Sequence, residues 1–199
     1  MYGRARGRER DIRSGCGATA GVQEPLTLAT ERRLRFALTA FLAVYGVVLA
    51  LHPERYGWLD SLDVAIHEVG HPLFGVFGEF IGMLGGTLMQ LLIPALFVWD
   101  FRRRGDRHAA TVALWWVAQN LWNISVYIKD ARAEELPLVG GGEHDWAYLL
   151  GRLGLLDQDQ LVGAAVYVAG LLLFAWSCLR GWTYAAAFVP SSDRSNKTP

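Results

Sequence analysis

The chain has 199 residues, of which 52% are hydrophobic and 19% charged, and its basic and acidic residues balance to a formal net charge of zero. This length allows one compact domain and excludes two large ones. High apolar content, with arginines crowded near the N-terminus, argues against a nucleic-acid-binding protein and indicates a membrane protein with basic flanks. Cys16 and Cys178 are the only cysteines, which argues against a disulfide framework and against a cysteine zinc site.

The two ends of the chain differ in composition from the middle. Residues 1–30 are rich in Gly, Arg, Ala and Thr without hydrophobic periodicity, and we expect a disordered, Arg-rich cytoplasmic tail there. Residues 189–199 should form a second disordered tail, and residues 31–188 a membrane-embedded catalytic domain. The first apolar run is not followed by a small-residue cleavage site, so no cleavable signal peptide is expected.

Four apolar runs follow one another along the chain, at residues 34–51, 80–99, 109–128 and 161–179. A helix needs about 20 such residues to cross the hydrocarbon core of a bilayer. The glycines and the proline inside the second run are tolerable because neighbouring helices can satisfy the backbone. The sequence therefore predicts an all-α, polytopic membrane bundle with about four full spans and the lipid bilayer as its partner.

Two further segments are helical by pattern but less apolar or shorter. Residues 61–79 are moderately apolar and contain two histidines. Residues 145–156 place apolar side chains at the i, i+3, i+4, i+7 spacing of one helix face, in a piece too short to cross a membrane. We expect the second segment to be a short amphipathic helix.

The basic clusters predict the topology. Arginines crowd the N-terminus, and a second cluster, Arg102-Arg103-Arg104 with Arg107, separates two of the predicted spans. Both clusters face the cytoplasm, as the positive-inside rule requires, if residues 61–79 enter the membrane without crossing it. Alternatively the segment spans and the second cluster violates the rule. We favour the first, with the N-terminus in the cytoplasm and the chain in a bacterial inner membrane.

The stretch Ile66-His67-Glu68-Val69-Gly70-His71-Pro72 carries the chemistry. Residues four apart lie on one face of a helix, so His67 and His71 can direct two imidazoles at one Zn²⁺ ion. Zinc lowers the pKa of a bound water, and Glu68 beside the histidines is placed to act as general base. The alternative is a pair of core histidines bonded to neighbours. Ionisable residues inside a membrane are costly and usually functional, which favours the metal site.

Pro72 follows the second histidine directly. Proline removes a backbone hydrogen bond and disfavours helical geometry at the residue before it. Gly75 and Gly78 come shortly after. We expect the helix to kink or break just past His71, in a region that faces protein or a water-filled cavity.

Catalytic zinc takes three protein ligands and keeps one position for water, so a third ligand is needed. Glu79 is well rotated from the histidines on a straight helix, and Asp100 adjoins an arginine cluster. The stretch Gly140-Gly141-Gly142-Glu143-His144-Asp145-Trp146 is the best remaining source. We expect His144 ahead of Asp145 as the ligand, because imidazole is the commonest metal ligand, with Asp145 able to orient a ligand histidine. Alternatively the stretch is an ordinary loop in which Asp145 caps a helix.

Asn120 and Asn123 lie in the third apolar run beside Gln119. Their amides can bind the backbone or a carbonyl oxygen of a substrate. The alternative is hydrogen bonding between helices, which is common in membranes and which we favour slightly.

In its motif His67-Glu68-Val69-Gly70-His71, set within an apolar chain, the sequence resembles the membrane-embedded zinc metalloproteases of the site-2 protease type. That resemblance implies that the two histidines bind zinc, that Glu68 is the base, and that an Asp from a distant span is the third ligand. The family's second motif, an Asn and a Pro ahead of Leu-Asp-Gly, is absent here. Its third ligand is therefore not carried over to a residue of this chain.

These observations predict an intramembrane zinc-dependent hydrolase, in first place a metalloprotease, acting on a membrane protein or lipid substrate. The alternatives are a zinc-dependent lipid amidase or other membrane hydrolase, and a non-enzymatic membrane protein that binds or transports a metal. A transporter is expected to carry further His or acidic residues along several spans. The first and last apolar runs contain none, which argues against transport.

Overall fold

The computed structural model describes residues 20–138 and 142–188, and residues Arg32–Phe188 form one compact unit to which the following description applies. Most of the two predicted tails lies outside the described residues. The helix α1 begins at Ala20, however, within the segment predicted as the N-terminal tail.

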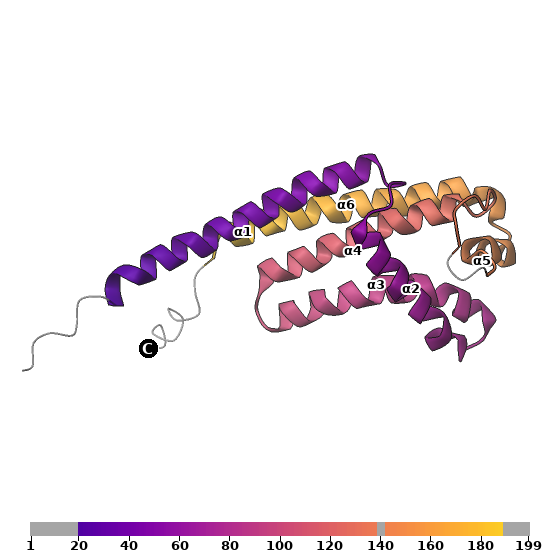
Figure 1. The fold of residues 1–199 in the computed structure, drawn as a ribbon, viewed down its shortest axis with the longest axis horizontal. Coiled ribbons are helices and arrows are strands. Elements are labelled where there is room, and N and C mark those ends of the chain that lie inside the picture. Colours follow the sequence, from indigo (N-terminus) through magenta and orange to yellow (C-terminus); the bar gives the residue numbers. More distant parts are fainter. Residues whose placement is uncertain (1–19, 139–141, 189–199) are drawn as a thin grey trace, which may run out of the picture. The chain divides into compact units, whose positions relative to one another are not determined.

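The described part of the chain is built from helices alone, which confirms the prediction of an all-α fold (Figure 1). In chain order they are α1 (Ala20–Leu51), α2 (Trp58–Gly75), α3 (Glu79–Arg103), α4 (Arg107–Lys129), α5 (Asp145–Leu153), a short 3₁₀ turn η1 (Leu156–Gln158) and α6 (Asp159–Ala186). The predicted amphipathic segment corresponds to α5, which ends at a left-handed Gly154.

Three of the described helices contain segments long and apolar enough to cross a membrane, at Leu28–Leu51, Glu79–Arg103 and Leu156–Ala186. They match three of the four predicted spans. The helix α4 covers the remaining predicted span, at 109–128, over 23 residues but is not among these segments. Its middle carries Gln119, Asn120, Asn123 and Ser125, and such polar side chains lower the mean hydropathy. Three of the four predicted spans are thus matched among the described residues, and the one in α4 is not confirmed.

The helices α1, α4 and α6 lie alongside one another (Figure 1). A Cβ atom at Gly170 of α6 would lie only 2.6 Å from Trp122 Nε1 of α4, so the missing side chain allows this close approach. The indole N–H of Trp115 donates to the Leu42 carbonyl of α1 at 2.9 Å, and the Tyr167 hydroxyl donates to the Ala50 carbonyl at 2.7 Å. Side chains of both α4 and α6 thus hold α1.

One ion pair shows that the start of α1 and the end of α3 lie at the same end of the bundle. Arg35, near the start of α1, lies 3.2 Å from Asp106, which follows α3 and caps α4 through the Ala109 amide. Burial disfavours the charged form of Asp106, but the Ala109 N–H and the Arg35 guanidinium keep its pKa below the ordinary value. The helix α1 leaves this end of the bundle and α3 returns to it. The segment between them therefore does not carry the chain to the opposite end, and Arg35 lies next to the loop between α3 and α4.

The helix α2 packs tightly across α3. A Cβ atom at Gly70 would overlap the Gly85 carbonyl, so the two backbones can touch only because glycine stands there. Pro72 does not end α2, which continues to Gly75, so the predicted break falls one turn later. The turn to α3 passes through Gly78, whose φ of 105° suits glycine alone.

Candidate metal centre

The two motif histidines lie on the side of α2 that faces the protein, with ring centroids 4.9 Å apart. His67 Nε2 is 2.8 Å from Oδ2 of Asp145, and His71 Nε2 is 3.3 Å from the same oxygen. Three atoms that are common metal ligands thus converge, two from α2 and one from the start of α5. In the metal-free protein a shared proton can hold each contact, and a divalent cation bound at the same point would replace those protons.

The Nδ1 atoms of both histidines also have hydrogen-bond partners. His67 Nδ1 lies 3.2 Å from the Gln90 side-chain oxygen, and His71 Nδ1 lies 3.0 Å from the Gly82 carbonyl. Because each partner is an oxygen acceptor, each Nδ1 must carry the hydrogen. In a neutral imidazole that leaves the lone pair on Nε2, the nitrogen directed at Asp145. This is the arrangement in which protein groups orient metal-binding histidines.

Glu68 completes the group. Donor atoms of His67, Glu68 and His71 all lie within 4.8 Å of one another, so this cluster can hold a metal ion. The Glu68 side chain is exposed, whereas His67 is buried. An exposed carboxylate beside two imidazoles suits a group that exchanges protons with water rather than one that is enclosed as a ligand.

The structure places the two candidates for the third ligand differently. His144 is the N-cap of α5, where its Nδ1 accepts a hydrogen bond from the Ala147 amide at 3.2 Å. Its Nε2 lies 3.3 Å from Asp130 Oδ2, away from the motif histidines. Asp145, predicted as second to His144 or as an N-cap, is instead the first residue of α5 and contacts both His67 and His71. Asp145 and not His144 is thus the residue that contacts the motif histidines.

The position of Asp145 is fixed from two sides. The short helix α5 buries Leu149 and Leu150, which attaches it to the bundle. The Asp145 amide also donates to the Tyr127 hydroxyl of α4 at 3.3 Å. Burial raises the pKa of the Asp145 carboxyl, but its contacts with His67 and His71 outweigh burial and hold the pKa below the ordinary value. Asp145 is therefore an ionised carboxylate directed at two imidazoles.

The remaining acidic candidates lie elsewhere. Asp100 accepts a hydrogen bond from Arg104 at 3.0 Å, near the end of α3 that carries the basic cluster. Glu79 begins α3 and lines a cavity beside the histidines without contacting them in the way Asp145 does. Of the predicted triglycine, Gly140 and Gly141 lie outside the described residues.

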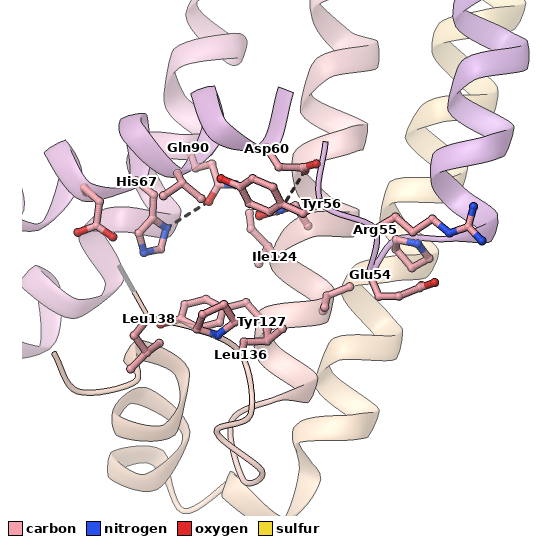
Figure 2. Close-up of a pocket in the computed structure, with 16 residues that line it drawn as sticks. Glu54, Arg55, Tyr56, Asp60, His67, Gln90, Ile124, Tyr127, Leu136 and Leu138 are labelled. Atoms are coloured by element: carbon pink, nitrogen blue, oxygen red, sulfur yellow. Dashed lines mark hydrogen bonds between the residues drawn. The ribbon is translucent and has the colours of Figure 1, made fainter. Parts of the chain in front are cut away.

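Two cavities meet at this site. The first, of about 380 Å³, lies between α2, α4 and the loops at 53–56 and 136–138 (Figure 2). The second, of about 330 Å³, is lined by His71, Glu79 and Asp145 among others. His67, Glu68, Tyr127 and Leu138 line both. His67 and Glu68 therefore border both cavities, and His71 borders the second.

The predicted amide residues are bound within the protein. Asn120 is fully buried, and its amide nitrogen donates to the Trp116 carbonyl at 3.0 Å. Asn123 lines the first cavity, but its side chain bonds Asp60 of α2 and Gln90 of α3. The contacts of Asn123 favour the alternative of bonding between helices, and the burial of Asn120 argues against substrate binding.

Sequence reasoning missed three buried polar residues near the site. Asp60 and Asp63 share the buried face of α2 with His67, and Gln90 contacts His67 from α3. A signal was present, because Asp60, Asp63 and His67 follow the i, i+3, i+7 spacing of one helix face. Two carboxylates on the same face as a motif histidine indicate a polar interior rather than a lipid-facing side.

No family model, curated protein or solved structure matches the chain. The fold and the site together define an all-helical protein with three candidate membrane spans and a histidine–glutamate cluster that can hold a metal ion, as far as the described residues extend.

Proposed function

We propose that the protein is an intramembrane zinc-dependent hydrolase, and in particular a metalloprotease. The observation that carries the proposal is the convergence of His67 Nε2, His71 Nε2 and Asp145 Oδ2, with each Nδ1 held by an oxygen acceptor. Two imidazoles and one carboxylate are a donor set typical of catalytic zinc, which keeps its fourth position open.

Each residue of the site has its own role in the proposed hydrolysis. Bound zinc would polarise the scissile carbonyl and lower the pKa of the attacking water. Glu68, exposed beside the histidines, takes the proton from that water and delivers it to the leaving nitrogen. Asp145 would hold the ion together with the two imidazoles, and Gln90 and the Gly82 carbonyl prevent the rings from turning.

The substrate is proposed to be a segment of a membrane protein. The larger cavity presents apolar residues, among them Ile124, Val126, Leu136 and Leu138, next to His67 and Glu68. An apolar lining favours a substrate drawn from the membrane over a soluble one. The amide bond of a lipid could be hydrolysed by the same residues, and comparing a peptide with a lipid amide distinguishes the two.

Purified wild-type chain is expected to contain about one zinc ion, the stoichiometry of a mononuclear catalytic site. His67→Ala and His71→Ala should lose it, and a chelator should abolish hydrolysis until zinc is restored. The measurement is metal analysis by mass spectrometry. His52→Ala is the control, because His52 is half-exposed beside Glu54 and outside the site. Zinc content that is unchanged in both motif variants would refute the site.

We further propose that the end of the bundle with the Arg35–Asp106 pair faces the cytoplasm of a bacterial inner membrane. A cysteine at position 104, in a chain lacking Cys16 and Cys178, should then react with an impermeant thiol reagent only from the cytoplasmic side. Glu54→Cys, in the loop after α1, should react from the outside and serves as the control. Labelling of position 104 from outside intact cells would contradict the orientation.

A further inference from the structure

A line of polar side chains joins three helices and ends on His67. Asn123 of α4 donates to Asp60 Oδ1 of α2 at 3.2 Å. Gln90 of α3 donates to the Asn123 side-chain oxygen at 2.9 Å, and its own oxygen lies 3.2 Å from His67 Nδ1 (Figure 2). Asp60 is 8% exposed and Gln90 3%, so the line runs through the interior.

The direction of every hydrogen bond in this line follows from one carboxylate. An ionised carboxylate only accepts hydrogen bonds. Asp60 Oδ1 receives the amide hydrogens of Gln119 and Asn123, at 3.1 and 3.2 Å, and Oδ2 receives the Gly57 backbone N–H at 2.6 Å. With its nitrogen turned to Asp60, Asn123 must present its oxygen to Gln90.

The same reasoning carries over to His67. Gln90 must turn its nitrogen to Asn123 and therefore its oxygen to the imidazole. His67 therefore carries a hydrogen on Nδ1, so Nε2 supplies the lone pair to a metal ion once the proton that it shares with Asp145 is displaced. If Gln90 were reversed, its NH₂ group would face Nδ1, and the hydrogen would move to Nε2, the atom that faces Asp145.

We propose that Asp60, Asn123 and Gln90 are positioning residues that hold His67 in its metal-binding tautomer and thereby set the affinity of the site. The inference rests on the proposed function for the metal itself. It adds that a carboxylate without direct contact with His67 controls the site through two amides. Partners of metal-binding histidines typically change affinity by about 10–100-fold when they are lost.

Zinc affinity of the Asp60→Asn variant tests the inference. Asparagine has the shape of aspartate, but its amide group can donate as well as accept a hydrogen bond. The side-chain amides of Asn123 and Gln90 can then reverse, and the dissociation constant for zinc should rise by about 10–100-fold. Asp63→Asn is the matched control. It removes a buried carboxylate from the same face of α2, but Asp63 bonds Trp116 and lies outside the line, so its zinc affinity should equal that of the wild type.

A rescue separates this role from a general loss of structure. Gln90→Glu alone keeps an acceptor-only side chain against His67 Nδ1, so the tautomer is retained without help from Asp60 and zinc affinity should not fall. In the double variant Asp60→Asn/Gln90→Glu, the new amide at position 60 can donate to Asn123. Asn123 can in turn donate to the new carboxylate at position 90, which still accepts from His67. The line then runs in reverse with the same tautomer, and zinc affinity should recover toward the wild-type value.

A wild-type chain that binds no zinc overturns the proposed function and this inference with it. A wild-type chain that binds zinc, with equal affinity in Asp60→Asn, overturns only the inference. So does a double variant that binds zinc as weakly as Asp60→Asn while keeping wild-type helix content by circular dichroism.

Discussion

Replacing Glu68 with glutamine should leave zinc in place and abolish hydrolysis. Glutamine has the shape of glutamate but cannot take a proton from the attacking water, and loss of a general base typically lowers the rate by about 10²–10⁴-fold. Glu68 is exposed beside the buried His67, so the change should not disturb packing. The measurements are zinc content and the initial rate of cleavage of a membrane-segment substrate.

Glu135→Gln is the control for this substitution. The Glu135 side chain is exposed in the loop after α4. The substitution makes the same change of charge as Glu68→Gln but lies away from the site. Zinc loss in Glu68→Gln as complete as in His67→Ala would make Glu68 a ligand rather than a base. A cleavage rate equal to that of the wild type would remove Glu68 from the mechanism.

Local patterns predicted the helices well because hydropathy and helical spacing act over neighbouring residues. The runs at 34–51, 80–99 and 161–179 all fall within helices that can cross a membrane. The spacing of His67 and His71 also predicted that their rings share one face. The run at 109–128 forms a helix as predicted, yet its amides face Asp60 and Gln90 rather than lipid, which a count of apolar residues cannot reveal.

Which of His144 and Asp145 contacts the motif histidines could not be selected from the sequence, because adjacent residues point in different directions at the start of a helix. His144 and Asp145 are neighbours, and only the way α5 docks decides which one meets α2. Burial of Leu149 and Leu150 and the use of His144 as N-cap turn Asp145 toward the histidines. Residue type alone favoured His144, since it takes no account of competition from the Ala147 amide for the imidazole.

Asp145→Ala should weaken zinc binding by far more than the 10–100-fold typical of a residue that only supports a ligand. The substitution removes a donor atom and also a negative charge in direct contact with both imidazoles. A doubly charged ion would then lie among neutral nitrogens in a partly buried site, which is costly in free energy. Titration against a competing chelator measures the change.

His144→Ala gives the matched comparison, because it changes the adjacent residue and leaves the carboxylate. It removes the N-cap of α5, a loss worth about 0.5–2 kcal/mol of stability, and the contact with Asp130. Zinc affinity should therefore fall only to the extent that loss of the N-cap displaces the Asp145 carboxylate. Glu79→Ala should leave it unchanged, since Glu79 lines the cavity without meeting the histidines. If His144→Ala abolishes binding while Asp145→Ala does not, or if only Glu79→Ala weakens it, the ligand set derived from the contacts of Asp145 is wrong.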